Sequence, residues 1–412
     1  MKSADQARTP SFAALRHPDY RVYFVTTALA MMADNIEHVI SYWVLFERFK
    51  APWFGGVAVL THWLPFLFFS VASGALADRY DNRRIIQAAM ALFMLASLGW
   101  ALLFLTDQLQ PWHAVVLLTV HGMAGVLWGP ASQVLVHDIV GVSHLQSAVR
   151  LNATSRNLGI LLGPAVGGGL MLLLGAAAGL LVNVLIYVPL IVWLWRSSYG
   201  MRPPGAGSVS ARPGGLRASL DLLKEASSNR PIIAMLALAG AASFFVGTAY
   251  QAQMPEYAHD LAGDHAHGSY SVLLAAGAAG AFIGGIVLES RSLLRARART
   301  AMVLTLLWSV AICGFAMTSN YLIAVTLMFV AGFLYLSFSA MAQTLVQVHA
   351  PSHLRGRLVG LFNMASNGLR AFSGITVGFL GSLIGVHWSL ALSALALAAV
   401  TSALIAFSIR SG

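Results

Sequence analysis

Residues 74–84 read GALADRYDNRR, a short charged stretch between two apolar blocks, 53–76 and 85–105. Each block has the length needed to cross a bilayer, which is roughly 20 residues for a helix. Apolar blocks separated by short polar breaks recur along the whole chain. This pattern predicts an integral membrane protein.

Composition supports this prediction. Of the 412 residues, 58% are hydrophobic and 10% are charged, and the mean hydropathy is +0.73. A soluble domain carries about 25% charged residues, so this chain has too little polar surface for that class. The single cysteine, Cys313, excludes a disulfide framework and a cysteine-based metal site. The polar first 20 residues indicate a tail, with no cleavable signal peptide.

The blocks predict an all-α membrane protein with twelve transmembrane helices in two six-helix halves. The predicted spans are 21–45, 53–76, 85–105, 112–136, 149–173, 177–195, 231–255, 269–289, 299–318, 321–347, 357–383 and 387–409. The longest break is rich in glycine and proline, as expected of a linker. The predicted organisation is a tail at 1–20, a first half at 21–195, a linker at 196–230 and a second half at 231–409.

The positive charges predict the orientation. With twelve spans, 21 of the 25 lysines and arginines fall on the side of both termini, and only Arg48 and Lys50 fall on the other side. Arg156 and Arg370 lie inside spans. Cytoplasmic loops carry the excess of lysine and arginine, so we expect the termini and the linker in the cytoplasm of a bacterial inner membrane. The net charge of +10 therefore indicates the membrane surface, not nucleic acid.

The two halves repeat each other at an offset of about 210 residues. Residues 133–136 (QVLV) recur as 343–346 (QTLV), and 143–145 (SHL) recur as 352–354. Parallel repeats of this kind place a substrate path between the halves, near the middle of the bilayer. The repeat predicts alternating access, in which the halves rock about one central site.

The stretch at 74–84 resembles the signature between helices 2 and 3 of the major facilitator superfamily. The matching residues are Gly74, Asp78, Arg79, Arg83 and Arg84. The chain departs from the pattern where an aspartate replaces the usual glycine at 81 and an asparagine replaces a basic residue at 82. The resemblance implies a gating motif in which a charge latch holds a neighbouring helix end. The alternative is a cluster of arginines that serves only the topology.

A second motif lies in the predicted fifth helix. The residues Gly159, Gly163, Pro164, Gly167 and Gly168 are similar to the superfamily's antiporter motif. The resemblance implies export. The alternative is a seam of small residues that only allows close helix packing.

The wider stretch 129–168, with Gln343 and residues 355–357, is similar to a bacterial branch that includes the enterobactin exporter and related efflux proteins. The resemblance implies proton-coupled export of an amphipathic small organic molecule, siderophore or drug-like. Bacterial lysophospholipid flippases share an Asp-Asn pair in helix 1, as at Asp34 and Asn35, so a lipid flippase is the alternative. A divalent-metal exporter that uses histidine and aspartate side chains is a third hypothesis.

The first helix carries the clearest candidates for a substrate and proton site. Asp34 lies 13 residues past Arg21, about 20 Å along the helix axis and near the middle of the bilayer. Glu37 and His38 follow on the same face. Charges at this depth are costly and mark functional sites, although Asp34 and Glu37 could also be structural.

Two arginines also lie at depth, and Asn152 is one turn from the first of them. Arg156 and Arg370 could pair with the carboxylates of helix 1 or bind an anionic substrate. A fixed internal ion pair is the equal alternative for each arginine. We expect Tyr250, Gln251, Tyr335 and Gln343 to line an amphipathic pocket.

Other histidines are weaker candidates. A lone histidine in an apolar helix, such as His62 or His121, is more often only hydrogen-bonded, although His121 could relay protons. Residues 256–267 contain histidines and carboxylates, but their loose spacing favours a solvated outer loop over a metal site. No catalytic pair or phosphate-binding loop occurs, so we expect no enzyme activity, no metal or cofactor, and the proton gradient as energy source. We expect a monomer whose partners are its substrate, protons and lipids.

Overall fold

The computed structural model describes residues 13–199, 223, 224, 226, 227, 229–291, 297–350 and 355–410. Within these ranges every regular element is helical and none is a strand. The predicted all-α fold is confirmed. The tail before residue 13 and most of the predicted linker lie outside the described residues, so the domain boundaries remain predictions.

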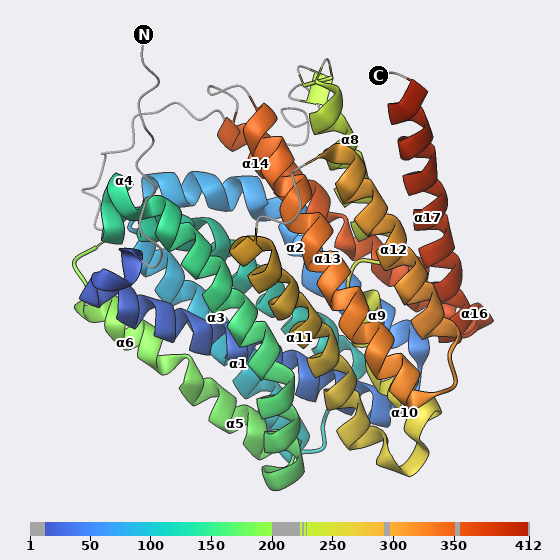
Figure 1. The fold of residues 1–412 in the computed structure, drawn as a ribbon. Helices are drawn as coiled ribbons and strands as arrows, with labels where there is room; N and C mark the ends of the chain where they lie inside the picture. The colour runs from blue at the N-terminus through green and yellow to red at the C-terminus, as the bar shows by residue number, and fades with distance from the viewer. Residues whose placement is uncertain are drawn as a thin grey trace.

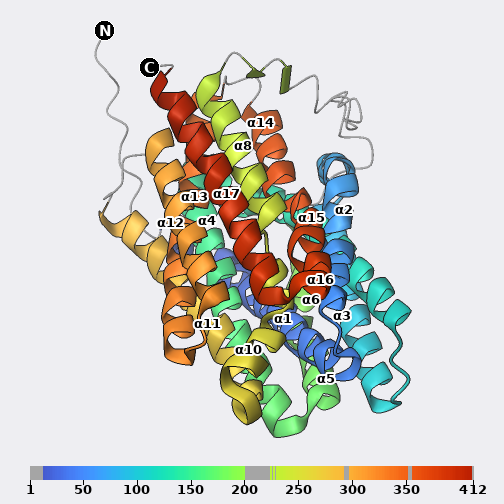
Figure 2. The ribbon, with the colours of Figure 1, turned by 90° about the vertical axis from the view of Figure 1, so that its right-hand side faces the viewer.

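The helices of the first half lie together in both views (Figures 1 and 2). They are α1 (Pro18–Phe49), α2 (Pro52–Arg79), α3 (Asn82–Leu105), α4 (Pro111–Leu174), α5 (Ala176–Ile186) and α6 (Val188–Arg196), after a 3-10 turn at Ala13–Arg16.

The second half lies beside the first, and its helices are more often interrupted. It comprises α8 (Arg230–Phe245), α9 (Ala249–Ala252), α10 (Met254–Ala262), a 3-10 turn at Gly263–His265, α11 (Ala266–Arg291), α12 (Ala298–Met317), α13 (Tyr321–His349), α14 (Arg355–Asn363), π-helical turns at Met364–Gly368 and Gly374–Phe379, α15 (Arg370–Ser373), α16 (Leu380–Ile384) and α17 (Val386–Arg410).

The spans account for the twelve predicted helices. Eight helical stretches of the described residues are long and apolar enough to cross a membrane, and Leu158–Leu174 and Gly268–Gly284 are shorter apolar helices. The other two spans are α1, which carries polar residues in its middle, and the stretch 355–384, which is interrupted by π-helical turns. In the described residues, a helical stretch thus corresponds to each of the twelve predicted spans.

Two glycines interrupt helices of the described structure. Gly141, at φ +67°, breaks α4 into the two predicted spans 112–136 and 149–173. Gly247, at φ +49°, ends α8 inside the predicted span 231–255. Both backbones occupy the left-handed region that favours glycine. Residues 256–267, predicted as an outer loop, are mostly helical in α10 and the turn after it.

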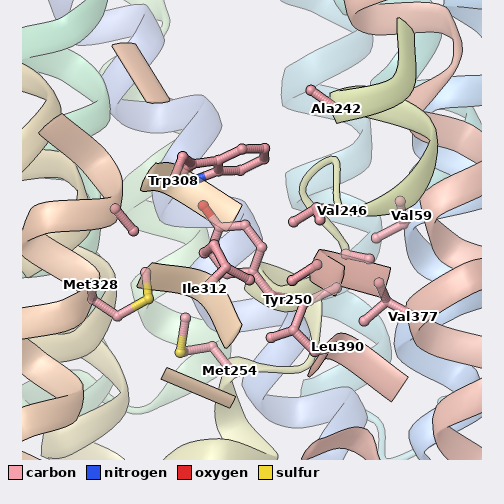
Figure 3. Packing of buried hydrophobic residues seen from close by; sticks show 14 of the residues in the cluster. Val59, Ala242, Val246, Tyr250, Met254, Trp308, Ile312, Met328, Val377 and Leu390 are labelled. Atoms are coloured by element: carbon pink, nitrogen blue, oxygen red, sulfur yellow. The ribbon is translucent and has the colours of Figure 1, made fainter. Parts of the chain in front are cut away.

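The halves meet at the end of the bundle that carries Lys50 and α10, called here the Lys50 end and predicted to face outside. One cluster of buried apolar side chains continues from Ile36–Leu45 of α1 and Phe54–Val59 of α2 into α8, α12, α13 and α17. Figure 3 shows Val59 of the first half in the same cluster as Val246, Val377 and Leu390 of the second. Burial of this shared surface holds the halves together at that end.

Glycines allow the closest approach between the halves. A Cβ atom at Gly56 of α2 would overlap the carbonyl oxygen of Gly374, and one at Gly378 would overlap the backbone of Gly56. A Cβ atom at Gly168 would overlap the hydroxyl of Ser271 on α11. Side chains larger than hydrogen would hold these backbones apart, so the seam at the Lys50 end depends on glycine.

Candidate functional site

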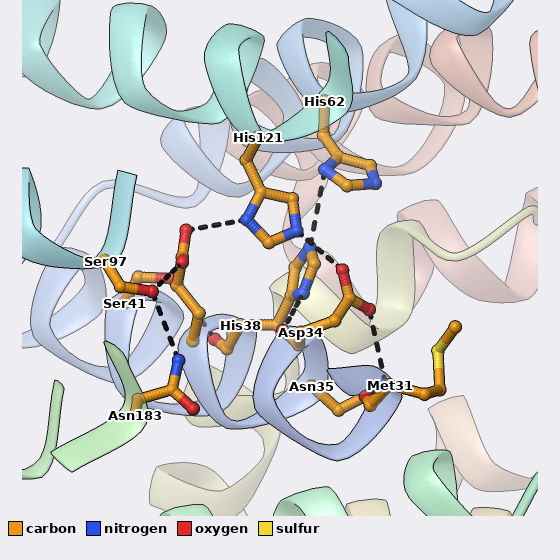
Figure 4. A network of polar contacts seen from close by, with 10 residues as sticks. Met31, Asp34, Asn35, His38, Ser41, His62, Ser97, His121 and Asn183 are labelled. Carbon is orange, nitrogen blue, oxygen red and sulfur yellow. Dashed lines mark hydrogen bonds and ion pairs between the residues drawn. The ribbon is translucent and has the colours of Figure 1, made fainter. Parts of the chain in front are cut away.

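A histidine of α4 lies between two carboxylates of α1 (Figure 4). His121 Nε2 is 2.7 Å from Asp34 Oδ1, and His121 Nδ1 is 2.7 Å from Glu37 Oε1. The side chains of His121 and Glu37 are each 1% exposed, whereas that of Asp34 is 20% exposed. The network is therefore closed at Glu37 and open at Asp34.

The local sequence explains this arrangement. Asp34, Glu37 and His38 are spaced i, i+3 and i+4, which places them on one face of α1. His121 faces them because α4 packs closely against α2 beside it. The next residue, Gly122, makes this possible, since a Cβ atom there would overlap the carbonyl oxygen of His62.

Further polar side chains hold the carboxylates. Ser97 of α3 donates its hydroxyl to Glu37 Oε2, and Asn183 of α5 donates to Ser97 Oγ at 3.1 Å. Asn35 donates to Asp34 Oδ2 at 3.3 Å. Buried polar groups are costly unless they are hydrogen-bonded, so these partners fix the carboxylates in place.

Two more histidines extend the network toward α2. His38 Nδ1 is 2.8 Å from the carbonyl oxygen of Asp34, and His38 Nε2 is 3.4 Å from His62 Nδ1. The ring centroids of His38 and His121 are 4.6 Å apart. In the part of the chain that the structure describes, these three histidines are the only group whose donor atoms lie close enough together to hold a metal ion.

Arg370 of the second half reaches the first half through a tryptophan. Its guanidinium lies 4.7 Å from the ring centroid of Trp63 on α2, its Nε donates to the Ser366 carbonyl at 2.9 Å, and an Nη donates to the Tyr335 hydroxyl. Trp63 Nε1 donates to Thr248 Oγ1 of the second half at 3.0 Å. Trp63 therefore joins the halves directly beside His62.

Arg156 lies near the carboxylates of α1. Its side chain is exposed, and its charge is within electrostatic range of Asp34 and Arg370. No ion pair among the described residues includes either arginine. Asn152, one turn earlier, has a buried Oδ1 atom without a hydrogen-bond partner in the described structure.

The four predicted pocket residues differ in their exposure. Tyr250 is buried in the apolar cluster near Trp308 (Figure 3). Gln251 is exposed, Tyr335 is half-buried against Arg370, and Gln343 is half-buried two turns further along α13. Tyr335 contacts Arg370, and Tyr250 lies within electrostatic range of both Arg370 and Tyr335.

The gating motif forms a local latch at the opposite end of the bundle. Asp81 caps α3 by accepting from the Arg83 backbone at 2.9 Å, and its Oδ2 lies 2.8 Å from an Nη of Arg83. Arg83 also donates to the carbonyl of Ser197, just past α6. Partial burial opposes ionisation of Asp81, but the hydrogen bonds from Arg83 outweigh it and lower the pKa of that carboxyl.

The remaining motif residues make fewer contacts. Arg84 donates to Gln87 Oε1 at 3.2 Å, and the Arg79 guanidinium lies 5.7 Å from the Tyr80 ring centroid. A Cβ atom at Gly74 would meet nothing within 4 Å. The side chain of Asp78 lies outside the described residues. Asp81, which departs from the superfamily pattern, pairs with Arg83 of the motif.

The antiporter motif forms a packing seam along α1. Cβ atoms at Gly159, Gly163 and Gly167 would meet backbone or Cβ atoms between Ala28 and Val39, and Gly168 faces α11. Pro164 lies within α4 without ending the helix. The seam holds the second part of α4 against the helix that carries Asp34 and Glu37.

Asp260, one of two aspartates in the 256–267 segment, pairs with histidines of α10 and α17. Asp260 Oδ2 is 3.1 Å from His387 Nε2, and Asp260 Oδ1 is 3.5 Å from His259 Nδ1. Close by, burial and then the charge of Asp260 raise the pKa of Glu256 to about 7.

Comparison with known proteins gives the family. The profile of the transmembrane secretion effectors, a group of major facilitator transporters, matches residues 9–412. The chain belongs to this family. Its members and its fold are those of transporters, not enzymes.

Individual relatives are more distant. A stretch of 147 residues is 31% identical to MdtD of Salmonella typhi, a protein named for multidrug resistance, and covers 36% of this chain and 28% of MdtD. A stretch of 128 residues is 27% identical to the MFS-type transporter YfiS of Bacillus subtilis, over 31% of this chain and 29% of YfiS. The matches thus span less than a third of either relative.

Solved structures share the fold. The nucleoside transporter NupG has a TM-score of 0.72 at 13% identity, with 94% of this chain and 99% of that chain covered. A bacterial homologue of the human lysosomal transporter Spinster, inward-facing and occupied, has a TM-score of 0.70 at 16% identity, covering 95% and 97%. These likenesses show the major facilitator fold.

Sequence reasoning missed part of the network. The sequence alone favours ordinary hydrogen-bonded roles for His62 and His121, yet His121 lies at the centre of the network and His62 at its edge. Ser97 and Asn183 were not singled out. They were visible as isolated polar residues within apolar blocks, which is the available signal for a buried polar partner.

Proposed function

We propose that this transporter exports an amphipathic small organic molecule by alternating access. One observation carries the proposal: the buried Asp34–His121–Glu37 network lies next to the contact through which Trp63 of one half meets Arg370 of the other. A change within the network is thereby placed where it can act on the seam between the halves. The Lys50 end is sealed by glycine contacts, which fits a state open toward the other side.

The substrate class rests on similarity and on side chains. The name of MdtD concerns multidrug resistance, which supports a drug-like molecule over the siderophore that the enterobactin branch implies. Aromatic rings at Trp63 and Tyr335 beside the exposed Arg156 offer apolar surface with few polar anchors. Amphipathic ligands bind in sites of this composition.

We propose the proton as the driving ion and Asp34 and Glu37 as the exchange groups. Each carboxylate is joined to His121 by a hydrogen bond that a proton can occupy. One structural neighbour, FucP of Escherichia coli, is named as a fucose:proton symporter, with a TM-score of 0.61 at 14% identity over 97% of this chain and 99% of that chain. We further propose an inner-membrane monomer with cytoplasmic termini, on the segregation of lysine and arginine.

Everted membrane vesicles test the proposal. In vesicles that contain the protein and are energised by respiration, we expect uptake of an amphipathic fluorescent dye such as ethidium, with collapse on addition of an uncoupler. Asp34→Asn should abolish the uptake, whereas Asp107→Asn, at an exposed ion pair with Arg48, should not. Dye uptake equal to that of empty-vector vesicles across a panel of cationic, neutral and anionic dyes would remove the export proposal.

A further inference from the structure

Four side chains from three helices converge beside the exchange groups. Asp34 and His38 come from α1, His62 from α2 and His121 from α4 (Figure 4). The ring nitrogens of the three histidines that face one another all lie within 4.8 Å. We call these four residues the histidine cage.

The hydrogen bonds around the cage determine which nitrogens point inward as acceptors. His38 Nδ1 faces the carbonyl oxygen of Asp34 at 2.8 Å, and His121 Nδ1 faces Glu37 Oε1 at 2.7 Å. Carbonyl and carboxylate oxygens only accept, so each Nδ1 must carry the hydrogen. His38 Nε2 then presents a lone pair to the cage, whereas His121 Nε2 also faces a carboxylate and donates to Asp34 Oδ1.

Two hydrogen bonds lie inside the cage. His121 Nε2 lies 2.7 Å from Asp34 Oδ1, and His38 Nε2 lies 3.4 Å from His62 Nδ1. A proton on His121 Nε2 joins it to Asp34, and a proton on His62 Nδ1 joins it to His38 Nε2. A metal ion that displaces these two protons can bind all four atoms together.

The separations fit a tetrahedral ion. Zinc binds imidazole nitrogen at about 2.0–2.1 Å, which places neighbouring ligand atoms about 3.3 Å apart. The 3.4 Å between His38 Nε2 and His62 Nδ1 matches this spacing. His121 and Asp34 would have to separate by roughly 0.6 Å, a side-chain rotation that their 2.7 Å contact permits once an ion replaces the hydrogen bond.

The surroundings of the cage resemble the outer shell of a metal site. Metal-binding histidines donate their second nitrogen to a carboxylate or a carbonyl, as His121 does to Glu37 and His38 does to the Asp34 backbone. Ser97 in turn holds Glu37. The carboxylates of Asp34 and Glu37 balance the charge of a divalent ion, and imidazole donors favour zinc, nickel or cobalt over magnesium or calcium.

We propose that the cage binds one divalent transition-metal ion of the zinc class through His38 Nε2, His62 Nδ1, His121 Nε2 and Asp34. All ligands belong to the first half, so the ion is not handed between the halves and is not the cargo. It is a regulator: by displacing the hydrogen between His121 and Asp34 it blocks the exchange groups and inhibits transport. The inhibition rests on the proposed function, but the binding does not.

Metal titration of the purified full chain tests the binding. After dialysis against a chelator and its removal, isothermal titration with zinc should show one ion per chain, and cobalt should give the intense visible bands of a tetrahedral complex. His38→Gln with His62→Gln should abolish both signals. Glu37→Gln, which alters only the outer shell, should weaken affinity by about 10–100-fold.

A second histidine pair gives the matched control. His17 Nε2 lies 3.0 Å from His144 Nδ1, but no third donor joins them in the described structure. His17→Gln with His144→Gln should therefore leave zinc affinity and the cobalt bands unchanged. The spectrum of the wild-type protein requires no variant, so a variant that misfolds does not obscure the result.

Two results would overturn the metal site: an octahedral cobalt spectrum in the wild-type protein, or zinc binding that survives the His38 and His62 substitutions. Transport measured with chelator present separates this proposal from the previous one. Dye export without zinc binding would contradict only the metal site. Zinc binding without dye export would contradict only the proposed export function.

Discussion

His121 and Glu37 form a buried pair, with 2.7 Å between His121 Nδ1 and Glu37 Oε1 and 1% of each side chain exposed. The two residues are 84 positions apart in the sequence. A second carboxylate, Asp34, occupies the other nitrogen of the same ring. The pair therefore joins α1 to α4 at the depth where ionisable groups are least tolerated. Each of the two side chains stabilises the charge of the other.

Removal of His121 alone should be strongly destabilising. His121→Phe leaves two buried carboxylates without a cation, and breaking a buried pair in this way costs about 3–5 kcal/mol. The thermal denaturation midpoint in detergent measures the loss. The triple variant Asp34→Asn, Glu37→Gln, His121→Phe removes every charge and should recover much of it. If the triple variant were no more stable than His121→Phe, charge would not be the reason.

The glycine seam should control opening at the Lys50 end. Gly56→Ala introduces a Cβ atom that overlaps the Gly374 carbonyl, so it should hold that end open. Opening can be measured with a single cysteine that replaces the buried Ala58 in a Cys313→Ala background. Gly56→Ala should make maleimide label this cysteine faster. Gly360→Ala, whose Cβ atom meets nothing within 4 Å, is the control. Equal labelling rates in the two alanine variants would contradict a closed seam.

The Trp63–Thr248 hydrogen bond should contribute to holding the halves together. Trp63→Phe keeps an aromatic ring under Arg370 but removes the donor, and Thr248→Val removes the acceptor. Each should lower stability by about 0.5–1.5 kcal/mol. A double-mutant cycle of denaturation measurements should find the double variant no worse than the poorer single variant. Simple additivity would show that the two side chains do not interact.

Glu256 should give the Lys50 end a pH dependence. Burial and the charge of Asp260 raise its pKa from 4.5 to about 7, so the folded protein binds this proton more tightly than the unfolded chain. The stability it contributes is complete below pH 4.5 and is lost as the pH rises through about 7. Glu256→Gln should flatten the denaturation midpoint over this window.

The control for that experiment is Glu47→Gln, at an exposed carboxylate near the same end. It should leave the pH profile as in the wild type. A profile that keeps its slope in Glu256→Gln would assign the dependence to another group, such as His387 or His259, which also face Glu256.

The fold could be predicted from the sequence, because each span and each loop charge is determined by a short local stretch of residues. Apolar length and the placement of arginines need no knowledge of contacts. The stripe of Asp34, Glu37 and His38 was also predictable, since helical periodicity alone puts them on one face. Arg156 and Arg370 were identified by their depth, and the structure brings both within electrostatic range of Asp34 or its neighbours.

The partners of that stripe were not predictable. The rotation of α4 about its axis, fixed in part by the close approach at Gly122, decides that His121 faces α1. Nothing local to His121 or His62 encodes this contact. The same limit applies to Tyr250, an expected pocket residue that packs into the apolar cluster instead. Gly247 breaks an apolar block whose hydropathy gave no sign of an interruption.

The exchange of protons for substrate by Asp34 and Glu37 is the central claim, and flux in proteoliposomes tests it most directly. With chelator present and a pH gradient imposed, the wild-type protein should move dye against its concentration gradient while protons move in the opposite direction. Asp34→Asn with Glu37→Gln should abolish both fluxes, and Asp107→Asn should preserve both. Dye movement that is indifferent to the pH gradient and to the double substitution would contradict proton-coupled export.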